Sequence, residues 1–156
     1  MSGTGQGMLA YVIFAIGEKR YALESGEVVE LLRSGQVQSF PHSTPGLVGV
    51  LLHRSTVLPV WDVAQALIGP GGAPQKYFLV ARCKFGGIEE WTAIPVSGEC
   101  QMLHAGMAPA LDLSPGYVRG VLTLDSEAIE VLDLDLLAAL FIVEREAPVE
   151  TEVKRQ

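Results

Sequence analysis

The sequence predicts an all-β protein that consists of two small barrels and a few short helices. Nearly half of its 156 residues are apolar, and Val, Leu and Ile recur in short alternating runs between Gly- and Pro-containing turns. The chain also repeats itself at a fixed offset, which marks a duplicated structural unit. The pattern of apolar runs and turns predicts four or five short strands in each copy. That number is too small for an open sandwich, and closure into a barrel removes exposed strand edges.

The duplication is visible in matching residues on either side of the middle of the chain. Gly49–Leu51 recurs as Gly120–Leu122, and Val60–Asp62 recurs as Val131–Asp133, so that both matches lie 71 positions apart. No insertion separates the two matches. The second half of each copy is therefore expected to have the same structure.

The first hairpin differs in length between the copies. Tyr11 matches Tyr77 at an offset of 66, which predicts five extra residues in the second copy, around Lys84 to Glu90. The turns of these hairpins are expected at Gly17-Glu18-Lys19 and at Gly86-Gly87.

One domain is expected over residues 9–140, with repeat units at about 9–69 and 75–140. Residues 1–8 are expected to form a disordered N-terminus, and residues 141–156 a polar C-terminal tail.

Each copy is expected to end with a hairpin and a short helix. Asp62 and Asp133 close the last strands and suit a helix N-cap, because a carboxylate accepts hydrogen bonds from free backbone N–H groups. The hairpin strands are expected at Leu47–Leu52, Thr56–Trp61, Tyr117–Leu124 and Ala128–Leu132.

Charge and hydropathy exclude several classes of partner. Eleven Lys and Arg against eighteen Asp and Glu give a net charge of −7, with no basic block or stripe. This argues against binding to nucleic acid or to an anionic membrane. No apolar run approaches the roughly 20 residues that span a bilayer, so direct membrane insertion is not expected. The N-terminal residues lack the charged and apolar segments of a signal peptide, which predicts a cytoplasmic protein.

The sequence contains no constellation typical of catalysis, of a metal site or of a cofactor site. The three histidines do not occur in metal-binding spacing, and the common phosphate, dinucleotide and hydrolase motifs are absent. Cys83 and Cys100 each lie in an apolar stretch, where a reduced buried thiol is the ordinary interpretation. We therefore expect a protein that is not an enzyme.

Several motifs together resemble the CheW family in order, spacing and duplication, over roughly Leu9 to Leu140. They are Phe14-Ala15-Ile16-Gly17, Tyr21-Ala22-Leu23, Val28-Val29-Glu30-Leu31, Gly49-Val50, Arg54, Val57-Leu58-Pro59-Val60-Trp61-Asp62 and Gly120-Val121. The resemblance implies two five-stranded SH3-like barrels around a shared core. It also implies an adaptor that couples chemoreceptors to a CheA-type histidine kinase. The alternative is a diverged CheW-like adaptor in a pilus, twitching-motility or other localisation complex.

The chain departs from the family at one motif. The family usually has Asn-Leu-Arg-Gly, whereas this chain has Leu52-His53-Arg54-Ser55 and keeps only the arginine. Ser55 replaces a glycine that could take a positive φ, so the turn is altered.

Arg54 and Glu30 are the charged candidates for partner binding. At a turn between apolar strands, the Arg54 guanidinium could bind a partner carboxylate in bidentate fashion, although a solvated arginine is the alternative. The second copy has Asp125 there, so the fold does not require the arginine. Glu30 is flanked by apolar residues and must reach solvent or a partner. Its equivalent, Gln101, also permits a purely structural hydrogen bond.

The apolar candidates are Val28, Leu31, Leu32 and Leu58, which are expected near a hydrophobic groove for the helical tip of a receptor. Core packing is the alternative for each of them. Pro59 cannot donate to a strand ladder, so its strand is expected at a sheet edge that could pair with another chain. An edge blocked against aggregation is the alternative.

Overall fold

The computed structural model describes residues 8–33, 35–39, 46–69, 77–85 and 87–140. The terminal segments predicted at 1–8 and 141–156 lie outside this range, apart from Met8. The strands are β1 (Leu9–Ile16), β2 (Lys19–Glu24), β3 (Val28–Leu32), β4 (Val37–Gln38), β5 (Leu47–His53), β6 (Thr56–Trp61), β7 (Tyr77–Phe85), β8 (Ile88–Val96), β9 (Gln101–Ala105), β10 (Ala108–Pro109), β11 (Val118–Leu124) and β12 (Glu127–Leu132). The helical segments are η2 (Ser25–Glu27), α1 (Ala64–Ile68) and residues 134–140.

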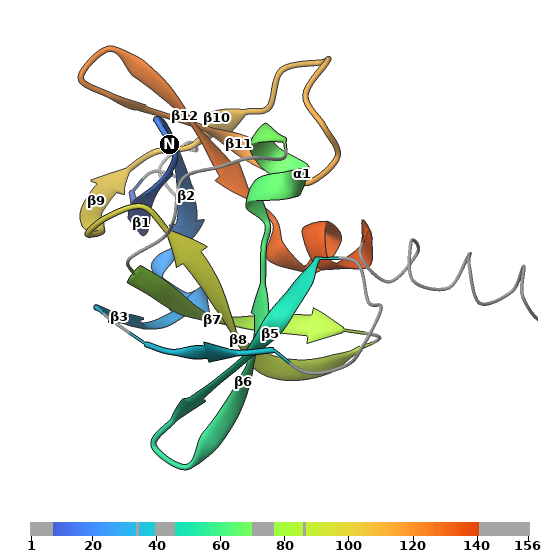
Figure 1. Ribbon diagram of the computed structural model, residues 1–156. Coiled ribbons are helices and arrows are strands. Elements are labelled where there is room, and N and C mark those ends of the chain that lie inside the picture. Colours follow the sequence, from blue (N-terminus) through green and yellow to red (C-terminus); the bar gives the residue numbers. More distant parts are fainter. Residues whose placement is uncertain (1–7, 34, 40–45, 70–76, 86, 141–156) are drawn as a thin grey trace, which may run out of the picture.

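The strands form two barrels, which confirms the predicted fold class (Figure 1). Sheet A has the order β10-β11-β12-β2-β1-β9, and sheet B has the order β3-β7-β8-β6-β5-β4. Five strands of each sheet have ordinary length, and the sixth, β10 or β4, has only two residues.

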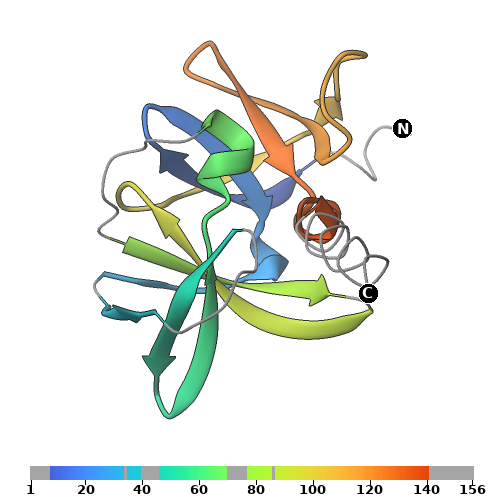
Figure 2. The same ribbon diagram turned by 45° about the vertical axis from the view of Figure 1, so that its right-hand side comes forward.

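The two sheets do not follow the boundary between the two copies. Sheet A joins β1 and β2 of the first copy to β9–β12 of the second, whereas sheet B joins β3–β6 to β7 and β8. In each sheet, strands of the two copies meet through a parallel pair, which is β12 with β2 in sheet A and β6 with β8 in sheet B. Each barrel is thus completed by the first hairpin of the other copy, an exchange that is visible in both views (Figures 1 and 2).

Three apolar clusters form the core. One cluster fills sheet A, with Tyr11, Ile13 and Leu122 among its members. A second fills sheet B, around Leu58 and Val80. The third and largest, which we call the shared core, lies between the sheets. It contains Val12, Phe14, Ile16, Tyr21, Leu23, Trp61, Val63, Ala64, Leu79, Ala81, Cys83, Ile94, Val96, Leu132, Leu134, Leu137 and Ala138.

The register corrects the predicted alignment of the first hairpins. Val12 pairs with Leu23, and Leu79 pairs with Ile94, and all four lie in the shared core. The offset in this strand is therefore 67, and the second hairpin is longer by four residues, not five. The match of Tyr11 with Tyr77 was wrong because a shift of one residue turns a strand's side chains to its other face.

The equivalent hairpins share one irregularity. The β5–β6 register shifts between Leu47 and Gly49, and the β11–β12 register shifts between Val118 and Gly120. A Cβ atom at either glycine would lie 2.5 Å from a backbone carbonyl oxygen of β4 or β10. The glycines therefore let the two-residue strands pack closely on the bulge.

The helices begin close to the predicted caps. Asp62 Oδ1 accepts a hydrogen bond from the Ala64 N–H at 3.2 Å, although the N-cap of α1 is Val63. Asp133 Oδ1 accepts a hydrogen bond from the Leu136 N–H at the same distance. The last helix also links the two sheets, since the Lys84 N–H of β7 in sheet B donates to Asp135 Oδ1 at 2.9 Å.

Gly49→Ala should lower the free energy of unfolding by about 1–3 kcal/mol, because the new methyl group would overlap the Gln38 carbonyl oxygen. Chemical denaturation measures the change. Gly26→Ala is the control, since a Cβ atom there meets nothing within 4 Å. Equal stability of Gly49→Ala and the parent chain would contradict the steric account.

Candidate functional site

The fold brings Glu30 and Arg54 together and adds His53 to them. Glu30 lies on β3, at the end of sheet B, and the other two lie at the tip of the β5–β6 hairpin. His53 Nε2 is 2.5 Å from Glu30 Oε2, and Arg54 Nη2 is 3.7 Å from Glu30 Oε1. The side chains of Glu30 and His53 are 27% and 22% exposed, whereas that of Arg54 is 77% exposed. The carboxylate therefore links a half-buried imidazole to an exposed guanidinium.

Sequence reasoning missed His53 because the three histidines do not occur in metal-binding spacing and no other motif marks His53. A weaker signal was present in the strand alternation. Leu51 is buried in the core of sheet B, and His53, two residues later, lies on the same face at the end of the strand. Glu30 and His53 are far apart in sequence, so the chain alone does not predict their contact.

The turn at this tip has an uncommon backbone. Arg54 and Ser55 have φ values of 53° and 66°, and the equivalent residues Asp125 and Ser126 have nearly the same values. The left-handed region is unfavourable for residues with a side chain, which explains why glycine suits position 55. Ser55 therefore occupies a conformation that a glycine would adopt at lower cost.

An exposed apolar pair lies beside the turn. Leu52 and Val57 face each other across β5 and β6, and they are 65% and 60% exposed. The second copy has Thr123 and Ala128 at the paired positions. Sequence reasoning missed this pair, although Leu51 and Leu58 are buried and strand alternation turns their neighbours outward.

The other apolar candidates divide between the surface and the core. Val28 and Leu31 are half-buried on β3 and pack against the shared core, while Leu32 packs against the core of sheet B. Leu58 is only 1% exposed within the sheet B core, so its side chain does not reach the surface. The alternative of core packing is thus the correct one for Leu58.

The predicted edge position of Pro59 was wrong. Its strand, β6, lies between β8 and β5 and not at an edge of sheet B. The pairing of β6 with β8 is confined to Val60 and Ala93, and the Pro59 carbonyl instead accepts a hydrogen bond from Thr92 Oγ1 at 3.1 Å. Because β6 pairs with β8 only at Val60, the ladder between these strands does not need an N–H from Pro59.

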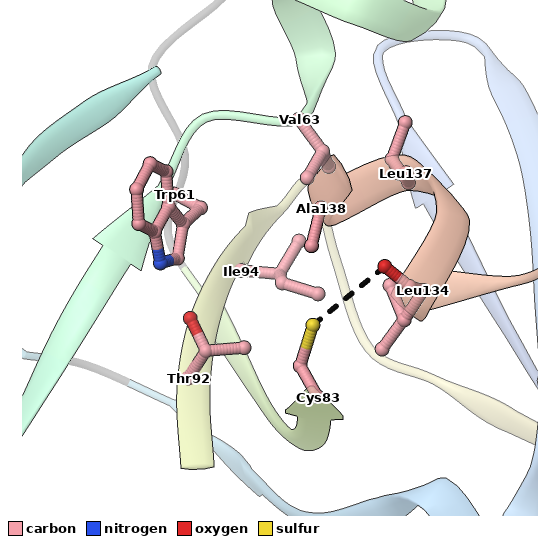
Figure 3. Close-up of a pocket in the computed structure, with 8 residues that line it drawn as sticks. All are labelled: Trp61, Val63, Cys83, Thr92, Ile94, Leu134, Leu137 and Ala138. Atoms are coloured by element: carbon pink, nitrogen blue, oxygen red, sulfur yellow. Dashed lines mark hydrogen bonds between the residues drawn. The ribbon is translucent and has the colours of Figure 1, made fainter. Parts of the chain in front are cut away.

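The pocket within the shared core is small and apolar (Figure 3). Its accessible volume of about 10 Å³ is close to that of a single water molecule. Cys83 lines it, and its Sγ lies 3.6 Å from the Leu134 carbonyl oxygen. Burial raises the pKa of the Cys83 thiol to about 12 and that of Cys100 to about 11. Both are free thiols, protected in the protonated form.

A second charged cluster surrounds Arg119 on β11. Its guanidinium lies 2.7 Å from Glu24, 3.4 Å from Glu27 and 3.5 Å from Asp133. Burial raises the pKa of Glu27, while the Arg119 charge acts in the opposite direction. Glu27 Oε1 is buried and makes no hydrogen bond within the described residues. This cluster joins β2, η2 and the start of the last helix, which indicates a structural role.

In the described part of the chain, no group of three or more His, Cys, Asp or Glu residues is arranged to hold a metal ion. The described helices are also too short or too polar to cross a membrane.

Comparison with known proteins identifies the family. Residues 10–141 match the family model described as a CheW-like domain. The chain belongs to the CheW-like domain family. Over 66 residues it is 35% identical to "Protein FrzA" of Myxococcus xanthus, a match that covers 38% of this chain and 41% of FrzA. It is 23% identical to "Probable chemotaxis protein CheW" of Rhizobium etli over 85% of this chain and 88% of that protein.

A solved structure supports the fold. The scaffolding protein TtCheW from Thermoanaerobacter tengcongensis superimposes with a TM-score of 0.71 at 16% sequence identity. The match covers 83% of this chain and 91% of TtCheW. The CheW-like barrels are thus retained although most side chains differ.

Ser55→Gly should raise the free energy of unfolding by about 1 kcal/mol, because glycine relieves the left-handed strain but also loses more chain entropy on folding. Ser126→Gly should act in the same direction at the equivalent turn. Ser114→Gly is the control, since Ser114 is not among the residues with positive φ. A lower thermal midpoint for Ser55→Gly would contradict this explanation.

Glu27→Gln should remove a pH-dependent loss of stability. Burial raises the pKa of Glu27 in the folded state, so its stabilising contribution is complete below the unfolded pKa and is lost as pH rises through the folded one. The stability difference should therefore shift in favour of the variant as the pH rises above the pKa of an unfolded glutamate, about 4.3. Urea unfolding at several pH values measures it, and parallel curves for the two proteins would contradict the prediction.

Proposed function

We propose that this protein is a non-enzymatic cytoplasmic adaptor that couples chemoreceptors to a CheA-type histidine kinase. Three observations support the proposal. The chain belongs to the CheW-like family over most of its length. Its similarity to the Rhizobium etli chemotaxis protein extends over 88% of that protein. The fold is that of TtCheW, which is described as a scaffolding protein.

The two hairpin tips differ in the side chains that they expose. The β5–β6 and β11–β12 hairpins have the same register shift and the same turn conformation, and they project from opposite ends of the molecule (Figures 1 and 2). Only the β5–β6 tip combines an exposed arginine with an exposed apolar pair. Since the fold tolerates Asp125, Thr123 and Ala128 at the equivalent positions, the first tip is adapted to something other than folding.

The β5–β6 tip is the proposed kinase-binding surface. Leu52 and Val57 offer apolar area that a partner can bury, and burial of apolar area favours association. Arg54 offers a guanidinium that a partner carboxylate can bind in bidentate geometry. Glu30 Oε1 lies 3.7 Å from this guanidinium, and the Arg54 side chain is 77% exposed, so a partner can reach it.

The β3 region is the proposed receptor-binding surface. Val28 and Leu31 are half-buried on a strand at the end of sheet B and are backed by the shared core. A helical receptor tip needs apolar anchors in a partly formed groove, and half-buried side chains of this kind suit it. Binding here leaves Leu52 and Val57 available on the outer face of the hairpin.

The mechanism that follows is geometric and involves no bond-making step. An adaptor that binds receptor and kinase at once converts their encounter into an event at high effective concentration. The rigid barrels then fix the distance and orientation between the two partners. A change in receptor packing would reach the kinase through this fixed geometry.

Co-sedimentation tests the proposal directly. A receptor cytoplasmic fragment should retain the regulatory domain of a CheA-type kinase from the same organism only when the adaptor is present. Arg54→Asp, and the double variant Leu52→Thr with Val57→Ala, should each reduce the retained kinase severalfold, about 1–2 kcal/mol per disrupted anchor.

The matched control places a charge reversal at the equivalent turn. Asp125→Arg should leave kinase retention unchanged, because that tip lies at the other end of the molecule. Failure of the unmodified adaptor to retain any kinase domain of its organism would exclude the proposed function. Equal losses for Arg54→Asp and Asp125→Arg would exclude the proposed surface.

A further inference from the structure

We propose that His53 makes the Arg54 surface responsive to pH. Protonated His53 takes over the carboxylate of Glu30 and leaves Arg54 free to bind an acidic group of a partner protein. The inference rests on the proposed function, because the partner is the kinase domain that binds this tip.

The two contacts of Glu30 differ in length and in exposure. Each carboxylate oxygen has its own neighbour, His53 Nε2 at 2.5 Å from Oε2 and Arg54 Nη2 at 3.7 Å from Oε1. The imidazole is in hydrogen-bonding range, whereas the guanidinium lies beyond the ordinary hydrogen-bond distance. The side chain of Arg54 is also 77% exposed, so a partner can reach it without disturbing the contact beneath.

Protonation of His53 raises the total charge of Glu30, His53 and Arg54 by one unit. With a neutral imidazole, the Glu30 charge is balanced by Arg54 alone, and a partner carboxylate must compete with Glu30 for the guanidinium. With an imidazolium, the Glu30–His53 bond becomes a charge-assisted pair, and such pairs are stronger than neutral hydrogen bonds. Glu30, His53 and Arg54 then carry a net positive charge, which favours an acidic partner.

Within the described residues, no other charged side chain lies directly opposite Glu30 or His53 in the sheet. Across the strand pair, Glu30 is opposite Val80 of β7 and His53 is opposite Thr56 of β6, and neither neighbour is charged. The nearby arginines have their own carboxylates. Arg33 lies 3.0 Å from Glu99, and Arg82 lies 3.7 Å from Glu89.

The second copy of the unit has no equivalent cluster. The residues that correspond to Glu30, His53 and Arg54 are Gln101, Leu124 and Asp125. The β11–β12 hairpin nevertheless has the same register and the same turn. The imidazole is therefore not needed to form the hairpin, since Leu124 occupies the equivalent position in the second copy.

The first measurement needs only the isolated protein. The Arg54 Nε–Hε resonance is followed by NMR between about pH 5 and pH 8, the range in which histidine changes charge. We expect a titration of this resonance that is lost in His53→Gln, whose neutral amide can still donate to Glu30. His104→Gln is the control and should keep the titration. An Arg54 resonance that does not depend on His53 would overturn the proposal.

The second measurement is the affinity of the kinase regulatory domain at pH 6 and pH 8. The unmodified protein should bind about threefold more tightly at pH 6, the effect of one partly exposed ion pair. His53→Gln should abolish its excess over the pH dependence of the kinase domain itself, whereas a ratio shared by both proteins overturns the proposal. If no kinase binds at either pH while Arg54 still titrates with His53, the proposed function fails and the coupling within the cluster is supported.

Discussion

The structure depends on two short parallel contacts that join strands from different copies, β12 with β2 and β6 with β8. Each pairs an early hairpin of one copy with the last strand of the other, so neither barrel is complete without both halves of the chain. The shared core lies where these contacts meet and takes residues from both sheets, from α1 and from the last helix. Because the shared core is the largest apolar cluster, separating the barrels would expose the greatest area of buried surface.

In this arrangement, the tips of the β5–β6 and β11–β12 hairpins contribute little to the packing of the core. Both tips lie beyond the buried residues and repeat the same strained turn. Their side chains could therefore diverge after the duplication without loss of the fold. One tip now presents Arg54, Leu52 and Val57 above Glu30 and His53, and the other presents polar or small residues. The stability of the common scaffold permits specificity in an exposed tip, where side chains are replaced at little cost.

Much of the fold could be predicted because it follows from local patterns. Strand alternation and the repeated aspartates are local signals, and each was placed correctly or within one residue, whereas the bulges at Gly49 and Gly120 were not predicted. The first hairpin was misaligned by one position because two tyrosines matched while the alternation of buried residues did not. Pro59 was placed at an edge on the basis of its missing N–H, but β6 lies inside sheet B because it pairs with β8 only at Val60.

The sequence by itself determined the class of the protein, the duplication and the two residues, Glu30 and Arg54, around which the candidate site is built. Only the tertiary structure showed that the copies exchange hairpins, that Leu58 is buried, and that His53 lies against Glu30. The physical reason is the range of the interactions. Alternation and turn chemistry act within a few residues, whereas the parallel contacts and the histidine–carboxylate pair join positions that only the closed barrel brings together.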